Sequence, residues 1–255
     1  MTAARPHHNH TRTEIPRYPS TPRRPARFLL GAALVFGTAA FARVHPAEGQ
    51  GGVITPLAAP RAESPTTPGR SDMETLVSEL KQGGYVVVFR HAPTNRDQAD
   101  TDPLDYSDTA HQRLLSENGK EIARQIGYAF RTLGIPIGKV YTSKYNRAVE
   151  TGKLIGGNGA ETTLDVTEGG LVATPIENDR RAAALKALAT TAPPAGTNTV
   201  IVTHKPNLVD AFGKEWVGSK DAEASVFKPD GSGQPVLVAR VQAADWVKAA
   251  KASSY

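Results

Sequence analysis

Two short runs of apolar residues stand out from the polar pattern that follows residue 71. Residues 85–89 (YVVVF) and 199–203 (TVIVT) are apolar or β-branched at every position. A strand with one solvated face alternates apolar and polar residues, whereas a continuous run is typical of a strand buried on both faces of a parallel sheet. The pattern therefore predicts two central strands, with a shorter strand at residues 139–142.

Helical periodicity separates these strands. Ile122, Ile126 and Phe130 recur every four residues after Ser116, which suits a helix N-cap, and Gly134 suits the helix end. Further helices are predicted at residues 71–82, 146–155, 177–189, 207–212 and around Trp246, a strand at 163–166, and an antiparallel hairpin joining 226–227 to 236–241. Strands alternating with helices predict an α/β three-layer sandwich, with a mainly parallel central sheet and helices on both faces.

An uncharged, mostly apolar stretch at residues 28–42 interrupts the N-terminal region after Arg23, Arg24 and Arg27. Its 15 residues fall short of the ~17–25 that a spanning helix needs, but they suit the core of a signal peptide. The sequence Ala-Phe-Ala that ends at Ala42 matches a small-x-small cleavage pattern. We expect export to the periplasm or the extracellular space. The alternatives are an uncleaved membrane anchor and a buried helix, and proline-rich flanks disfavour the latter.

Composition and charge divide the chain in the same way. Residues 1–27 form a basic, proline-rich segment expected to be disordered, 43–70 a flexible linker, and 71–255 the folded domain. Residues 1–70 hold 9 Lys+Arg and 3 Asp+Glu, a net charge of +6, and residues 71–255 hold 21 and 22, a net charge of −1. The near-neutral domain argues against a nucleic-acid partner. The absence of cysteine excludes thiol chemistry and disulfides.

Candidate chemistry lies directly after the predicted strands. His91 follows the first apolar run and His204 the second, while Arg90 adjoins His91 and Arg147 follows the strand at 139–142. In open α/β sheets, ligands bind at the carboxyl ends of the strands. Guanidinium groups suit phosphate oxygens, and a neutral imidazole can act as a nucleophile near pH 7.

Three segments carry a family resemblance. Residues 90–94 (RHAPT) resemble the Arg-His-Gly-x-Thr signature of the histidine phosphatase superfamily, residues 143–151 (SKYNRAVET) its Ser-x-x-x-Arg-Ala-x-x-Thr segment, and residues 202–204 (VTH) its second histidine. Their order and spacing also agree with that family. The resemblance implies the phosphoglycerate-mutase-like fold of a compact member.

The resemblance implies roles for the matching residues. His91 is expected to attack phosphorus and form a phosphohistidine, with Arg90 and Arg147 holding phosphoryl oxygens. His204 would donate to the same group, and Thr94 would add a hydroxyl contact. The implied activity is hydrolysis of a phosphomonoester or phosphohistidine, on a phosphorylated small molecule or a phosphoprotein, without a metal or cofactor. A phosphomutase and a non-catalytic, exported phospho-ligand binding module remain alternatives.

Departures from the family pattern leave the general acid open. Ala92 replaces the signature glycine, and Asp97 stands where many members have asparagine. An acid must reach the leaving oxygen and carry a proton at working pH. Four residues are candidates: Glu168, Glu177, Asp97 and Glu223.

The loop between the first strand and the helix after Ser116 is rich in aspartates. Its residues Asp100, Asp102, Asp105 and Asp108 lack the spacing of a calcium-binding loop. We expect them to be solvated residues that cap turns near the mouth of the site.

Overall fold

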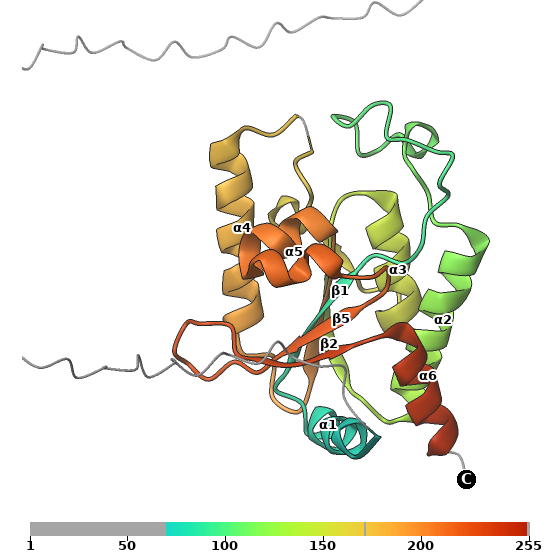
Figure 1. Ribbon diagram of the computed structural model, residues 1–255, viewed down its shortest axis with the longest axis vertical. Coiled ribbons are helices and arrows are strands. Elements are labelled where there is room, and N and C mark those ends of the chain that lie inside the picture. The colour runs from blue at the N-terminus through green and yellow to red at the C-terminus, as the bar shows by residue number, and fades with distance from the viewer. Residues whose placement is uncertain (1–69, 171, 254–255) are drawn as a thin grey trace, which may run out of the picture. The chain divides into compact units, whose positions relative to one another are not determined.

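A six-stranded mixed sheet forms the centre of the computed structural model (Figure 1), which describes residues 70–170 and 172–253. The segments predicted at 1–27 and 28–42 lie outside the described residues, as do residues 43–69 of the linker predicted at 43–70, whereas Arg70 begins helix α1. No helix within the described ranges is both long and apolar enough to span a membrane.

The strands follow the order β3-β2-β4-β1-β5-β6. Neighbouring strands are parallel from β3 to β1, whereas β5 pairs antiparallel with both β1 and β6. The predicted hairpin is thus confirmed as β5 and β6, and the sheet is mainly parallel. The strands are β1 Val86–Arg90, β2 Ile137–Thr142, β3 Glu161–Thr162, β4 Asn198–Thr203, β5 Ala224–Phe227 and β6 Leu237–Val241.

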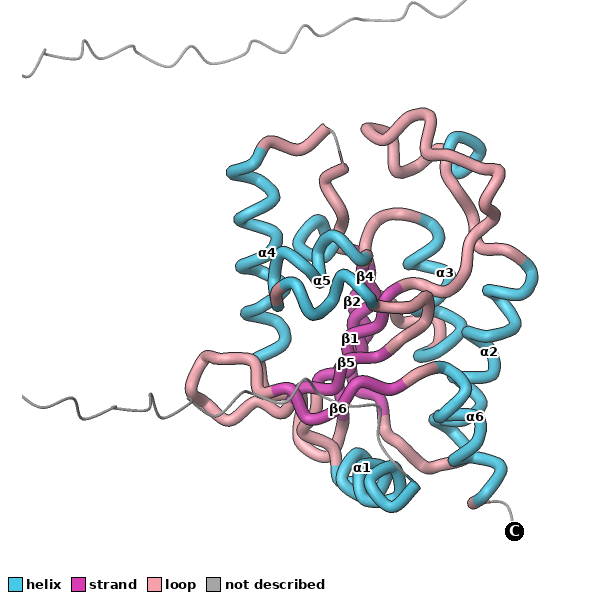
Figure 2. The backbone as a smooth tube through the Cα atoms, in the orientation of Figure 1, coloured by secondary structure: helices cyan, strands magenta, loops and turns pink. Residues whose placement is uncertain are grey.

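Helices cover both faces of the sheet, as the alternation of elements predicted. Figures 1 and 2 show α4 and α5 on one face and α2, α3 and α6 on the other, with α1 near α6. The α/β three-layer architecture is therefore confirmed. The helices are α1 Arg70–Gln82, α2 Glu117–Thr132, α3 Asn146–Gly156, α4 Pro175–Thr190, α5 Lys205–Phe212 and α6 Ala243–Ala252.

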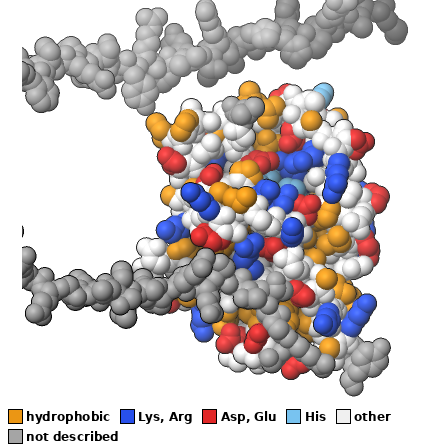
Figure 3. Space-filling model, viewed as in Figure 1, with side chains coloured by type: hydrophobic (Ala, Val, Ile, Leu, Met, Phe, Trp, Pro, Cys, Tyr) orange, Lys and Arg blue, Asp and Glu red, His pale blue; other side chains and the backbone are white. Residues whose placement is uncertain are grey.

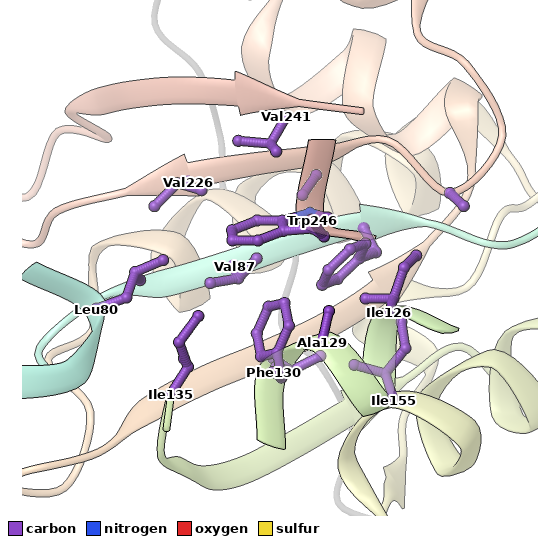
Figure 4. Packing of buried hydrophobic residues seen from close by; sticks show 14 of the residues in the cluster. Leu80, Val87, Ile126, Ala129, Phe130, Ile135, Ile155, Val226, Val241 and Trp246 are labelled. Carbon is purple, nitrogen blue, oxygen red and sulfur yellow. The ribbon is translucent and has the colours of Figure 1, made fainter. Parts of the chain in front are cut away.

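The central strand β1 is apolar at successive positions because it packs on both sides. Val86 and Val88 join the cluster under α4 and α5, whereas Val87 and Phe89 join the larger cluster that contains Trp246. Figure 4 shows Val87 and Trp246 in that larger cluster. Fully burying a side chain of this kind stabilises the fold by about 1.5–3 kcal/mol. This packing on both sides holds β1 in place up to its carboxyl end.

The strand predicted at residues 163–166 is wrong. The chain pairs with β2 at Glu161–Thr162, the Thr163 amide donates to the Thr142 carbonyl at 2.9 Å, and a 3₁₀ turn follows at Leu164–Val166. The hydroxyl of Thr163 accepts a hydrogen bond from the amide of Asp165, which favours the turn over continued pairing. The turn buries Val166 and directs the following residues along the carboxyl edge of the sheet.

Candidate active site

The strand register brings the two histidines together. Arg90 pairs with Thr203 in the parallel ladder of β1 and β4, so His91 and His204 leave the sheet side by side. The His91 amide donates to the Thr203 carbonyl at 2.9 Å, and the two imidazole centroids lie 5.2 Å apart. Strand β2 ends beside them, where the Ser143 amide donates to the Val202 carbonyl at 3.0 Å. Three parallel strands therefore deliver side chains to one edge.

His91 is held with one ring nitrogen available. Its Nδ1 lies 2.8 Å from the Ala92 carbonyl oxygen, which can only accept, so Nδ1 carries the proton and Nε2 keeps a lone pair. The ring is 3% exposed. Burial lowers the pKa of His91 well below 6.5, and His204, Arg147 and Arg90 lower it further, against the Ala92 hydrogen bond. The imidazole is therefore neutral and nucleophilic at pH 7.

His204 is completely buried beside it. Its Nε2 hydrogen-bonds the Ser143 hydroxyl at 2.7 Å, and its Nδ1 lies 3.4 Å from Glu168 Oε1. That Nδ1 has no hydrogen-bond partner among the described residues. Burial lowers the pKa of His204 well below 6.5, with Arg147 as the next cause. A neutral His204 can donate one hydrogen bond to a bound anion.

Arg147 lies near the N-terminus of α3 and is the most enclosed cation of the site. Its side chain has no exposed surface, and its guanidinium lies 4.2 Å from the Tyr145 ring centroid. One terminal nitrogen donates to Asp100 Oδ1 at 2.9 Å and the other donates to Glu168 Oε1. Both hydrogen-bonding ends of this guanidinium are thus held by carboxylates.

Arg90 is positioned from the other side by the loop before β5. Its guanidinium donates to the Ser219 carbonyl at 2.8 Å and pairs with Asp221 at 2.6 Å. The same loop supports His91, because the Ala222 amide donates to the His91 carbonyl at 3.1 Å. Arg90 Nε is buried without a hydrogen-bond partner within the described part of the chain. One loop thus fixes both Arg90 and the backbone of His91.

Thr151 connects helix α3 to the loop after His91. Its hydroxyl donates to the Arg147 carbonyl one helical turn earlier, at 2.7 Å, and accepts from the Ala92 amide at 3.1 Å. The loop after His91 is also held by α2, where Ser116 hydrogen-bonds the Pro93 carbonyl. A Cβ on Gly119 would lie 1.9 Å from that same carbonyl oxygen, so only glycine permits this approach. Ala92 is accommodated in the core with no exposed surface.

Glu168 is the candidate acid that the structure brings to the histidines. Its neighbour Thr167 fixes it, since the Thr167 hydroxyl donates to Thr163 O at 2.7 Å and accepts from the Lys144 amide at 2.9 Å. Its carboxylate then contacts Arg147 and lies near His204.

The other candidate acids are held elsewhere. Glu177 pairs with Arg180 and Arg181 on its own helix, and these hydrogen bonds lower its pKa to about 2. Glu223 is buried against Arg240 and accepts from Gln242 Nε2 at 2.6 Å. Asp97 is exposed in the loop after His91.

Thr94 lies between His91 and the same exposed loop. It is half-buried and forms an isolated bridge with Leu115. Its hydroxyl contact with phosphate stays a prediction.

The sequence did not reveal the role of Asp100. Asp102, Asp105 and Asp108 each accept from a backbone amide two residues later, as turn-capping residues do. Asp100 instead accepts from the Arg113 amide and from Arg147, both at 2.9 Å. Nothing in its spacing distinguishes it from its neighbours, because the contact depends on how the loop folds back. Tyr145 was missed as well, although its place two residues before Arg147 was visible.

The site lies on a surface of mixed charge. Figure 3 shows basic side chains and a histidine near the middle of the upper half of the viewed face, with acidic side chains beside them. Within residues 70–170 and 172–253, no three His, Asp or Glu side chains are grouped so as to hold a metal ion.

The similarity of this chain to known proteins is a similarity of structure. No protein-family model matches the chain, and no curated protein matches it. Solved structures do. Among them are structures named as phosphatases, and this likeness concerns the fold.

Three of these neighbours illustrate the similarity. The protein histidine phosphatase SixA, complexed with tungstate, is 20% identical, with a TM-score of 0.45 over 63% of this chain and 98% of SixA. A mutant phosphoserine phosphatase from Entamoeba histolytica, in complex with phosphoserine, is 13% identical, with a TM-score of 0.46 and coverages of 63% and 98%. The same organism's phosphoserine phosphatase with 3-phosphoglyceric acid is 15% identical, with a TM-score of 0.42 and coverages of 61% and 95%.

Proposed function

We propose that this protein is a histidine phosphatase that hydrolyses a phosphomonoester or a phosphohistidine through a covalent intermediate on His91. The observation that carries the proposal is the orientation and protonation of the His91 ring. Nδ1 is committed to the Ala92 carbonyl, Nε2 keeps its lone pair, and burial keeps the imidazole neutral. Such a ring is a nucleophile held in one orientation, which is what a covalent phosphoryl-transfer step requires.

The first step transfers the phosphoryl group to His91. The Nε2 lone pair attacks phosphorus, a nitrogen–phosphorus bond forms, and the bond from phosphorus to the leaving atom breaks. The leaving atom, an oxygen in a phosphomonoester or a ring nitrogen in a phosphohistidine, takes the electron pair and a proton from an acid. His204 lies beside His91, with the two ring centroids 5.2 Å apart, and Arg90 directly precedes His91 in the chain. Arg147 contacts Glu168, which also lies near His204. We assign these three side chains to the phosphoryl oxygens, where charge develops, and the proposed step uses no metal ion.

The second step releases phosphate. A water oxygen attacks phosphorus while a base takes one of its protons. The nitrogen–phosphorus bond breaks, and its electron pair returns to Nε2. The base then holds the proton that the next cycle's leaving group needs, so one carboxyl group can serve both steps.

Glu168 is the carboxyl group we assign to this role. It pairs with Arg147 and lies 3.4 Å from His204 Nδ1. Phosphoryl oxygens on Arg147 would bring the leaving oxygen to the side of the site where this carboxyl group lies, and an acid must be within reach of that oxygen.

A direct test compares His91→Ala with His111→Ala on a generic aryl phosphate. His111 lies in the exposed loop, where its ion-pair partner is Asp108, so its replacement controls for the loss of an imidazole. We expect His91→Ala to abolish turnover and His111→Ala to retain it. Unchanged turnover in His91→Ala would rule out the proposed nucleophile.

A non-catalytic phospho-ligand binding module is the second candidate, with a phosphorylated small molecule or a phosphoprotein as its ligand. The observation that favours it is the occupation of both ends of Arg147 by carboxylates, together with Ala92 at the signature glycine position. Such a module would bind phosphate and never form a covalent product. Detection of phosphate on His91 separates the two candidates, and retention of that phosphate for transfer to an acceptor would indicate a phosphomutase.

We also propose that residues 28–42 direct export of the protein to the periplasm or extracellular space. The support is the apolar stretch after three arginines and the cleavage pattern that ends at Ala42. Mass spectrometry of the mature protein is expected to find Arg43 at its N-terminus. An intact N-terminus in the membrane fraction would instead indicate an anchor, with membrane contact through these residues alone.

A further inference from the structure

We propose that Asp100 competes with the phosphoryl group for Arg147. Binding of the phosphoryl group then displaces the Asp100 carboxylate from the guanidinium. The inference rests on the proposed function as far as Arg147 is assigned to phosphate, and it adds a residue that sets the affinity of that site. Asp100 lies nine residues after His91, on the loop between β1 and α2.

The contact itself resembles that of a ligand. Arg147 has no exposed side-chain surface, and Asp100 Oδ1 accepts from its terminal nitrogen at 2.9 Å. A carboxylate offers a guanidinium the same pair of anionic oxygens that a phosphate offers. Asp100 and Glu168 each accept from one terminal nitrogen, so a phosphoryl group that approaches these nitrogens meets two carboxylates already in contact with the guanidinium.

Asp100 is the partner better placed to move. The segment before Glu168 is fixed to buried elements, since Thr203 Oγ1 donates to Val166 O at 2.7 Å and Asn207 Nδ2 donates to Thr167 O at 3.2 Å. Asp100 belongs to a long loop whose residues are mostly exposed, and its own side chain is 20% exposed. Exposed loops open at lower free-energy cost than segments tied to the core.

The exchange lowers the net gain from binding phosphate. A phosphoryl oxygen that takes the place of Asp100 on Arg147 replaces a charge-assisted hydrogen bond that already exists, and it meets the displaced carboxylate nearby. Weak retention of inorganic phosphate follows, which suits an enzyme that must release this product. Removing the carboxylate should therefore tighten phosphate binding.

The experiment measures binding of inorganic phosphate and of orthovanadate to the intact protein by titration calorimetry. Asp100→Asn keeps an oxygen that can accept from the Arg113 amide and from Arg147, as Oδ1 does, so it removes the charge while leaving both contacts possible. Asp102→Asn is the matched control, because Asp102 sits in the same loop and accepts only from the Leu104 amide. Asp100→Ser is a second variant without the charge.

We expect Asp100→Asn and Asp100→Ser to bind phosphate about tenfold more tightly than the wild type, the size of effect typical of one hydrogen bond to a charged group. Asp102→Asn should stay within about twofold of the wild type, as befits a solvated charge that lies outside the contact. Unchanged or weaker binding by both Asp100 variants, or equal tightening by Asp102→Asn, overturns the proposal. So does a failure of all these proteins to bind phosphate.

Trapping of phosphate on His91, measured in parallel, keeps this result separate from the proposed function. Tighter binding by the Asp100 variants without any phosphoenzyme would support the competitor and contradict the phosphatase. Phosphoenzyme formation with unchanged phosphate affinity would support the phosphatase and contradict the competitor.

Discussion

One hydrogen bond determines which nitrogen of His91 can react. The Ala92 carbonyl fixes the proton on Nδ1, and the next residue along the chain therefore sets the chemistry of the nucleophile. The ring is also desolvated, which keeps it neutral without an acidic neighbour to orient it. This differs from a nucleophile activated by a separate base, because the lone pair is already available at neutral pH.

The low pKa of His91 predicts an unusual pH profile. Protonation of Nε2 blocks attack, and a lowered pKa means that this protonation occurs only in more acid solution. We expect the acid limb of kcat/KM, corrected for the second ionisation of the phosphate substrate near pH ~6, to lie below pH 6.5. Steady-state kinetics between pH 4.5 and 8 on an aryl phosphate would measure it. An acid limb above pH 6.5 contradicts a buried, neutral His91.

Replacing Glu168 tests the assigned acid. Glu168→Gln should lower kcat for an alkyl phosphate by about 10²–10⁴-fold, the range usual for a general acid, because an alkoxide leaves poorly without a proton. It should affect a nitrophenyl phosphate far less, since nitrophenolate leaves unaided. Glu177→Gln is the control, as Glu177 pairs with arginines of its own helix. An equal loss on both substrates would point to Glu168 as a structural partner of Arg147.

At the residue scale, the sequence predicted those contacts that follow from the pairing of strands. His91 and His204 follow strands whose pairing aligns them, so their proximity was predictable from two apolar runs. The choice among four carboxylates was not, because it depends on a 3₁₀ turn that directs Glu168 to Arg147. The contact of Asp100 was likewise hidden, since a loop without periodicity carries no signal of where it folds.

At the scale of elements, Thr151 joins helix α3 to the loop after β1. Its hydroxyl bridges the Arg147 carbonyl and the Ala92 amide, and all three groups are buried. The bridge couples the placement of the arginine to the placement of His91. It gives a physical reason for a threonine four residues after the arginine, where helical spacing puts the hydroxyl beside the earlier carbonyl.

Thr151→Val tests this bridge. Valine has nearly the same shape but leaves the Ala92 amide buried without an acceptor, a loss of about 1–3 kcal/mol in unfolding free energy. We expect a matching drop in stability by urea denaturation, together with a lower kcat. Thr151→Ser retains the hydroxyl and should keep most of the activity. If the valine variant is as stable and active as the serine variant, the bridge contributes to neither stability nor activity.

The apolar runs and the helical periodicity predicted most strands and helices, because the burial of one or two faces of an element determines where its apolar residues stand in the sequence. Strand β1 faces two clusters, and its continuous apolar run could mean little else in an α/β chain. The failure at residues 163–166 has a local cause, since Thr163 caps a turn with its own hydroxyl. Short polar side chains that compete with the ladder are invisible to a pattern of apolar positions.

At the scale of the whole molecule, the net charge of the folded domain does not show where its charged side chains gather. Residues 71–255 carry a net charge of −1, yet Arg90 at the end of β1 and Arg147 at the start of α3 lie at the same edge of the sheet. Burying such groups is costly unless each is paired, and carboxylates of three loops supply the partners. A near-neutral domain whose two site arginines are each paired with carboxylates suits a single phosphoryl group rather than a polyanion.

The most direct test of the central claim is rapid-quench trapping of a phosphoenzyme. The wild-type protein is mixed with a labelled phosphomonoester, quenched in base to preserve phosphoramidate bonds, digested and sequenced by mass spectrometry. We predict phosphate on the peptide that contains His91, formed before free phosphate appears and absent in His91→Ala. Steady release of phosphate with no label on His91, or label on another residue, would contradict the account.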